Sequence, residues 1–152
     1  MTGFRLTRRR WIGGLAALIP AAGEARAAGN GPIAQPADPT PKGFIARAFD
    51  MRRRAEKEGD QPYGAVVAKD GKIVGEAPSR VVTGSDPTAH AETEAIRDAA
   101  RRLGNRNLSG CILYSSSRPC PMCEAAAYWA GIGGMVHGSD MTDVGTPRLS
   151  RC

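Results

Sequence analysis

Helical and β-strand patterns alternate along this chain, and the alternation restricts its possible folds more than any other feature. The predicted helices cover residues 41–59, 91–103 and 121–130, and the predicted strands cover residues 63–68, 72–76, 112–116 and 132–137. The first two strands flank Asp70-Gly71, a strong hairpin signal, so they are expected to be antiparallel. Helices alternate with strands in the second half, which indicates parallel strands linked by crossovers. The sequence therefore predicts an α/β fold of three layers, α-β-α, around a mixed sheet of about four strands.

The length of 152 residues is enough for one modest core and too short for two ordinary domains. In the predicted helix at residues 91–103, alanines at helical spacing form the packing face. The charged side chains of this helix are expected to face water, and they are Glu94, Arg97, Asp98, Arg101 and Arg102. Residues 138–152 contain few sizeable apolar side chains, so no further core element is expected there. One edge of the sheet is then bare or is covered by a partner chain.

The first 27 residues have the pattern of an export signal. Thr7-Arg8-Arg9-Arg10-Trp11-Ile12 resembles a twin-arginine motif, and Ala25-Arg26-Ala27 supplies the small residues of a cleavage site. The intervening apolar stretch contains glycine and proline and is too short to span a bilayer. We expect a twin-arginine signal at residues 1–27, a flexible linker at residues 28–40, and an exported, for example periplasmic, mature protein. A disordered basic arm or a membrane-anchoring helix is the alternative.

Most of the positive charge of the chain lies in this leader. The whole chain carries a formal charge of +6, but residues 1–27 hold five arginines against one glutamate. Residues 28–152 are left with +2, which indicates no particular anionic partner. Binding to nucleic acid depends on many phosphate contacts from lysine and arginine, so the charge argues against that function class.

The chain holds only two histidines and four cysteines, so few residues can bind a soft metal ion. Cys120 and Cys123 lie three positions apart at the start of a predicted helix, where they share a face and the helix N-terminus favours thiolate. His90, at the entrance to the preceding helix, is available as a third ligand. Three protein ligands leave one position of a zinc ion open for water, which is typical of catalytic zinc sites. Glu92 supplies a carboxylate beside that position, as proton transfer requires.

Each of these residues also has a simpler interpretation when it is taken alone. Cys120 and Cys123 could form a redox pair or a structural disulfide, because the protein is expected to be exported. His90 could cap a helix, and Glu92 could be an ordinary first-turn carboxylate favoured by the helix dipole. Only the combination of the four residues indicates a catalytic metal site.

The combination also identifies a family resemblance. His90-Ala91-Glu92 followed by Pro119-Cys120-Pro121-Met122-Cys123 matches the signature of zinc-dependent deaminases. The chain from about residue 41 to residue 138 resembles the cytidine deaminase-like superfamily, in the branch that contains guanine deaminases and transfer-RNA adenosine deaminases. Ala127-Tyr128-Trp129-Ala130 is more similar to the guanine deaminases.

The resemblance implies that family's fold, one zinc ion per chain, a homodimer and a role for Glu92 in moving protons. It also assigns substrate contacts. Ser79 occupies the position of an asparagine that holds the substrate in relatives, and Asp143 matches an acid near the substrate of guanine deaminases. Trp129 could stack on a bound purine, or it could fill space between helix and sheet. Arg118 stands where relatives commonly carry glutamate, so substrate identity is left open.

Relatives continue after the fourth strand with a fifth strand and a terminal helix, which this chain is not expected to form. The resemblance implies hydrolytic deamination of a small nucleobase or nucleoside, with a guanine-like purine as the first choice and ammonia as a product. The alternatives are a transfer-RNA adenosine deaminase and a catalytically impaired zinc-binding relative.

Overall fold

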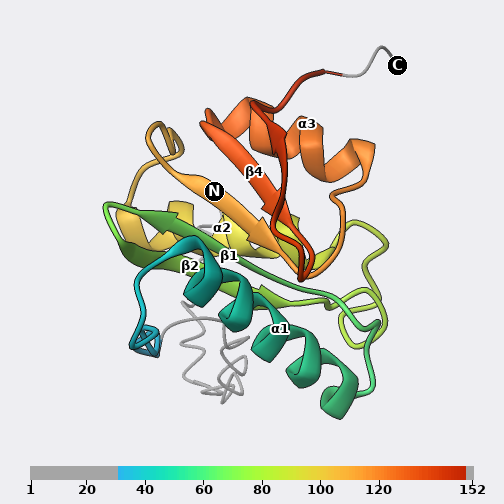
Figure 1. The fold of residues 1–152 in the computed structure, drawn as a ribbon. Coiled ribbons are helices and arrows are strands. Elements are labelled where there is room, and N and C mark those ends of the chain that lie inside the picture. Colours follow the sequence, from blue (N-terminus) through green and yellow to red (C-terminus); the bar gives the residue numbers. More distant parts are fainter. Residues whose placement is uncertain (1–30, 150–152) are drawn as a thin grey trace, which may run out of the picture.

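A mixed five-stranded sheet runs through residues 31–149, the part of the chain that the computed structural model describes (Figure 1). Its strands are β1 (Gly64–Lys69), β2 (Lys72–Pro78), β3 (Ile112–Ser115), β4 (Gly134–His137) and β5 (Thr142–Gly145). Their order in the sheet is β2-β1-β3-β4-β5. The β3 and β4 strands are parallel, as the helix–strand alternation predicted, and β1 and β2 are antiparallel, as the hairpin signal predicted. The β1–β3 and β4–β5 pairs are antiparallel as well. The expected export signal lies outside the described residues.

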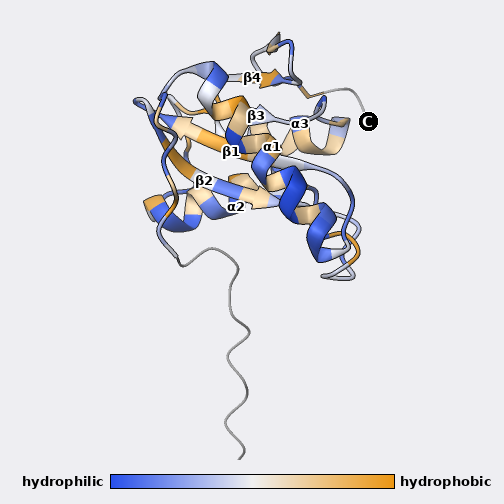
Figure 2. Cartoon of the chain, turned by 60° about the horizontal axis from the view of Figure 1, so that its bottom comes forward, coloured by the Kyte–Doolittle hydropathy of each residue, from blue (hydrophilic) through white to orange (hydrophobic). Residues whose placement is uncertain are grey.

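Three helices cover the two faces of this sheet. They are α1 (Pro41–Glu58), α2 (Ala91–Leu103) and α3 (Pro121–Ala130). One core cluster joins α1 to one face, and a second cluster joins α2 and α3 to the other face. Figure 1 shows α1 and α2 on opposite sides of the sheet, and Figure 2 shows hydrophilic residues along the outer side of α1. The predicted three-layer α-β-α fold is confirmed.

Helices approach this sheet closely from both sides where a strand carries glycine. A Cβ atom on Gly64 would lie 2.3 Å from the carbonyl oxygen of Ala48 in α1. A Cβ atom on Gly75 would lie 2.5 Å from the backbone nitrogen of Ala99 in α2. Ala99 is itself fully buried. Small residues on the strands and on the helices therefore set the separation of the layers, and with it the positions of the helix ends.

The fifth strand is a difference from the expected sheet of about four strands. The β5 strand pairs with β4 through Val136↔Asp143 and His137↔Thr142. Its side chains are mostly exposed, so the strand is held by backbone hydrogen bonds and leaves no hydrophobic alternation in the sequence. Among the described residues no helix follows β5.

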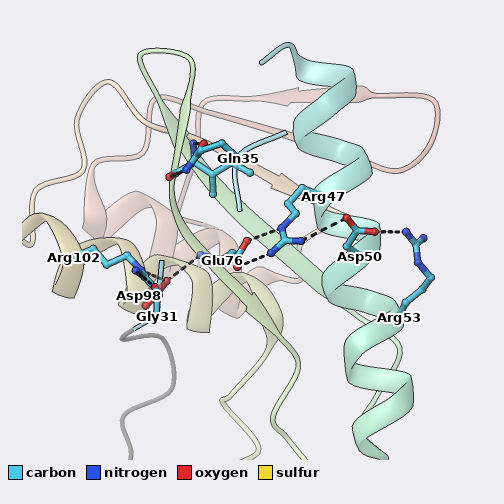
Figure 3. Close-up of polar contacts among 9 residues, drawn as sticks. Gly31, Gln35, Arg47, Asp50, Arg53, Glu76, Asp98 and Arg102 are labelled. Carbon is cyan, nitrogen blue, oxygen red and sulfur yellow. Dashed lines mark hydrogen bonds and ion pairs between the residues drawn. The ribbon is translucent and has the colours of Figure 1, made fainter. Parts of the chain in front are cut away.

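Asp98 is a second difference, because the helical pattern placed it on the outer face of α2. The residue is only 2% exposed. Its Oδ2 accepts hydrogen bonds from the backbone nitrogen of Glu76 at 3.1 Å and from Nε of Arg102 at 2.7 Å (Figure 3). Arg47 in α1 binds the Glu76 carboxylate through two bonds of 2.8 Å. A buried carboxylate is tolerated when it is paired in this way, and the network ties both helices to β2.

The segment 31–40, for which the composition indicates a flexible linker, lies against β2 and α1 in the structure. The side chain of Gln35 donates to the carbonyl oxygen of Ile73 at 2.9 Å and accepts from its backbone nitrogen at 2.8 Å. Arg102 donates to the carbonyl oxygen of Gly31 at 2.8 Å (Figure 3). The two Gln35 contacts occupy backbone groups of β2, an edge strand of the sheet. In residues 31–149 no helix is long and apolar enough to span a bilayer.

Candidate metal and catalytic site

The two helices that carry the predicted metal ligands begin at the same end of the sheet. Both β2 and β3 are antiparallel to β1, so they run in the same direction. Because α2 follows β2 and α3 follows β3, the first turns of these helices meet beyond the same strand ends. His90 is the N-cap residue of α2, Cys120 is the N-cap residue of α3, and Cys123 lies in the first turn of α3.

Neither N-cap side chain is used to cap its helix. Residues at this position usually accept a hydrogen bond from the first turn, but His90 and Cys120 make no such bond. Their side chains lie near each other instead, with Sγ of Cys120 3.7 Å from Nδ1 of His90. The positive ends of both helix dipoles stabilise thiolate at this point.

The ligand atoms have the spacing of a metal site. The Sγ atoms of Cys120 and Cys123 are 3.6 Å apart, and the ligand atoms of all three residues lie within 4.8 Å of one another. Zinc binds sulfur at about 2.3 Å and nitrogen at about 2.0–2.1 Å in a tetrahedron, which places neighbouring ligand atoms about 3.5–3.8 Å apart. His90, Cys120 and Cys123 therefore fit a zinc ion that keeps one position free. Both cysteines are free thiols, so the structure does not form the alternative disulfide.

Glu92 lies beside this cluster in the first turn of α2. It is 5% exposed, and its Oε2 lies 3.5 Å from Sγ of Cys123. Burial raises the pKa of Glu92, and the contacts with Cys123 and His90 offset that effect only in part. A raised pKa makes a carboxyl group a better proton acceptor and lets it return the proton later, as a general acid–base group must.

Thr93 is a contact that the sequence did not single out. The residue is 8% exposed, and its Oγ1 lies 3.5 Å from Sγ of Cys123. Burial raises the pKa of the Cys123 thiol, and the hydroxyl of Thr93 acts in the opposite direction. A hydroxyl that donates to a sulfur ligand stabilises its thiolate form and fixes its orientation. The position of Thr93 directly after Glu92 is the sequence feature that could have identified this contact.

A cavity of about 430 Å³ opens onto the cluster. Its wall is formed by Gln61, Tyr63, His90, Glu92, Ser117, Arg118 and Cys120. Ser117 and Arg118 precede the cysteine motif directly, which is the signal that could have identified them as wall residues. Gln61 and Tyr63 come from the loop between α1 and β1 and carry no local signal. The volume lies in the range of small-molecule sites.

Asp60 fixes the loop that supplies Gln61 and Tyr63. Its Oδ1 accepts from the backbone nitrogen of Gln61 at 2.8 Å. Its Oδ2 accepts from the backbone nitrogens of Val82 and Thr83 at 3.0 and 2.8 Å, and from the Thr83 hydroxyl at 2.8 Å. Burial alone raises the pKa of Asp60, but these hydrogen bonds outweigh it and hold the pKa well below its usual range. Asp60 thus clamps one cavity wall to the turn that follows β2.

The three expected substrate contacts do not line this cavity. Ser79 is 1% exposed, and its Oγ has no hydrogen-bond partner of normal geometry among the described residues. Trp129 is 76% exposed, so it does not fill space between helix and sheet. Asp143 lies on β5, where its Oδ1 accepts from the backbone nitrogen of Gly145 at 2.7 Å. Substrate binding by these residues stays a prediction, whereas His90, Glu92, Cys120 and Cys123 are brought together.

Comparison with known proteins supports the metal site that the geometry indicates. The family described as "Cytidine and deoxycytidylate deaminase zinc-binding region" matches residues 39–139. A guanine deaminase of Bacillus subtilis is 50% identical over 101 residues, which are 66% of this chain and 65% of the relative. A tRNA-specific adenosine deaminase of Aquifex aeolicus is 43% identical over 83 residues, 55% of each chain.

A solved structure shares the fold. The X-ray structure of the Bacillus subtilis guanine deaminase superposes with a TM-score of 0.61 at 44% sequence identity, covering 63% of this chain and 62% of that chain. The matched region thus spans less than two thirds of the length of these relatives. It contains every residue of the metal cluster and Glu92.

Proposed function

Because the chain belongs to the cytidine and deoxycytidylate deaminase zinc-binding family, we propose that it is a zinc-dependent hydrolase that deaminates a small purine. A guanine-like ring is the first choice. The proposal depends on one observation: an imidazole, two thiols and a buried carboxyl converge on the floor of an open cavity.

Metal binding and proton transfer are assigned to different residues of the site. His90, Cys120 and Cys123 would hold the zinc ion, which when bound supplies the Lewis acidity that makes water nucleophilic near neutral pH. Glu92 takes one proton from the attacking water and delivers it to a ring nitrogen. It then transfers the remaining proton of the added hydroxyl to the amino group, which leaves as ammonia while the carbonyl forms. Water adds to the ring carbon that bears the amino group, and ammonia leaves. Burial of Glu92 excludes bulk water from these transfers.

Guanine is preferred because a guanine deaminase is 50% identical over the matched region. The second candidate is adenosine in transfer RNA, which the 43% identical relative supports. The net charge of +2 on residues 28–152 argues against that candidate, because RNA binding depends on phosphate contacts. Export argues against it as well, since transfer RNA is cytoplasmic.

Export through the twin-arginine pathway is part of the proposal. That pathway carries folded proteins, which suits a domain that must acquire zinc while its thiols are reduced. The mass of the mature protein recovered from the periplasm tests it. Loss of residues 1–27 is the expected result, and an unprocessed cytoplasmic protein would contradict it.

We further propose a homodimer that forms through α3. Five apolar or aromatic side chains of this helix recur on one exposed or half-exposed face, and they are Pro121, Met122, Ala125, Tyr128 and Trp129. Trp129 is the most exposed of them at 76%. A contiguous apolar face of this kind is typical of protein–protein contacts. Light scattering on Trp129→Glu should show a shift from dimer to monomer, and an unchanged mass would count against this surface.

A substrate panel tests the activity. Ammonia release is measured from guanine, adenine, cytosine and their nucleosides with the zinc-loaded protein. Glu92→Gln keeps the size of the side chain and should abolish turnover while zinc content stays near one per chain. Deamination by the Glu92→Gln variant at the wild-type rate would refute the role of Glu92. Absence of deamination with every substrate would favour the catalytically impaired alternative.

A further inference from the structure

Arg118 places a permanent positive charge on the wall of the catalytic cavity. It is exposed, and no hydrogen bond or ion pair of its side chain occurs among the described residues. Several other arginines of the fold are paired: Arg47 binds Glu76, Arg54 binds Glu58 and Arg102 binds Asp98. The guanidinium of Arg118 therefore keeps its donors available to a molecule that enters the cavity.

The cavity has a buried floor and an exposed rim. Glu92 on the floor is 5% exposed, whereas Tyr63 on the wall is 41% exposed and Arg118 is exposed as well. A ring that reacts beside Glu92 would direct its remaining substituents toward the rim. The cavity volume of about 430 Å³ leaves room for such substituents.

The charged groups that line the cavity include Glu92 on its floor and Arg118 at its rim. Gln61, Tyr63 and Ser117 are polar and uncharged, so Arg118 is the one arginine or lysine of the cavity wall. A guanidinium presents several donors in one plane, and this arrangement matches the oxygens of a phosphate group. Neutral nucleobases and nucleosides can accept hydrogen bonds from a guanidinium, but they carry no negative charge to pair with it.

We propose that Arg118 binds the phosphate of a purine nucleoside monophosphate, so that the substrate class of this site is the nucleotide and not the free base. The proposal rests on the deaminase function proposed above and narrows its substrate. The phosphate takes no part in the chemistry. Water still adds at the ring carbon, ammonia still leaves, and the phosphate ester is unchanged.

The first test compares kcat/KM for guanine, guanosine and guanosine 5′-monophosphate. The wild-type protein should prefer the monophosphate to guanosine by about tenfold, the effect of one charge-assisted contact at a partly hydrated site. Arg118→Gln should remove this preference by raising KM for the monophosphate. Arg118→Lys should keep part of it. The matched control is Arg106→Gln, because Arg106 is exposed, lies outside the cavity and has no partner among the described residues.

A binding measurement separates this proposal from the proposed function. Calorimetry of the zinc-loaded Glu92→Gln variant with guanosine 5′-monophosphate and with guanosine needs no turnover. Tighter binding of the monophosphate that disappears with Arg118→Gln supports the proposal even if no ammonia is released in any assay. Equal binding of the two compounds, or a preference that survives Arg118→Gln, overturns it.

Two further experiments test whether tighter binding of the monophosphate has a cause other than Arg118. Inorganic phosphate should compete with the monophosphate in wild-type protein and more weakly with Arg118→Gln. Competition of equal strength in both would assign the phosphate to the metal and refute the role of Arg118. A short guanosine-containing RNA that bound more tightly than the monophosphate would also overturn the proposal, in favour of a nucleic-acid substrate.

Discussion

Replacing Asp60 with alanine should destabilise the fold and loosen one wall of the cavity. The carboxylate is 8% exposed and accepts four hydrogen bonds, three of them from backbone nitrogens. Asp60→Ala would leave these donors without their acceptor. A hydrogen bond to a charged group contributes about 1.5–3 kcal/mol. Water can reach part of this turn, because Val82 is 58% exposed. We therefore expect Asp60→Ala to lower the free energy of unfolding by about 3 kcal/mol, which corresponds to the loss of one or two such bonds.

The pH dependence gives an independent measure of the same carboxylate. The pKa of Asp60 is lowered in the folded protein from its ordinary value of 3.8, so the unfolded chain binds a proton more readily. The stabilisation is thus present above the unfolded pKa and is lost as the pH falls below it toward the folded value. Asp60→Asn keeps the size of the side chain but removes its charge. The difference in unfolding free energy between wild type and Asp60→Asn should shrink as the pH is lowered from about 7 to about 3.

Urea unfolding monitored by circular dichroism measures both effects. Asp140→Ala is the matched control, since Asp140 is exposed and, among residues 31–149, accepts a hydrogen bond only from its neighbour Ser139. This control should change the free energy of unfolding by no more than about 0.5 kcal/mol. A loss of the same small size for Asp60→Ala, or a pH-independent difference for Asp60→Asn, would refute the reasoning. In the folded fraction, Asp60→Ala should raise KM more than it lowers kcat, because it moves the wall and not Glu92.

Three other substitutions test the layers and the metal cluster. Thr93→Val should weaken zinc binding about tenfold, because it removes the hydroxyl beside Cys123, and competition with a chromogenic chelator measures this. Asp98→Ala should cost about 2–4 kcal/mol in urea unfolding, since it removes the buried acceptor shared by the Glu76 backbone nitrogen and Nε of Arg102, and a cost below about 1 kcal/mol would contradict the network. Gly75→Ala should lower the thermal midpoint by pushing α2 away from β2, a strain of about 1–3 kcal/mol, and an unchanged midpoint would show that the layers adjust.

Sequence patterns predicted the layers and the metal cluster because both are encoded locally. Thr40 followed by Pro41 marks the start of α1, and Gly104 and Gly131 mark the ends of α2 and α3 in left-handed backbone conformations. The ligands lie at helix starts, so a correct prediction of the helices also placed the ligands.

Two features of the structure leave no signal in the local hydrophobic pattern of the sequence. Asp98 looks like a surface residue in the helical pattern, and only its approach to the Glu76 backbone shows why it is buried. The β5 strand is held by backbone pairing, which leaves no apolar signal. Ser79, Trp129 and Asp143 do not line the cavity, and their contacts with a substrate stay predictions.

The carboxamide of Gln35 has a practical consequence for anyone who shortens this protein. A gene that begins at residue 41, where the first helix starts, would appear to retain the whole catalytic unit. It would also uncover the backbone of Ile73 on a terminal strand of the sheet, the kind of surface on which one polypeptide adds to another. Such a shortened product should precipitate at concentrations at which the longer protein remains in solution. The residues just before the first helix would then protect this sheet edge from self-association.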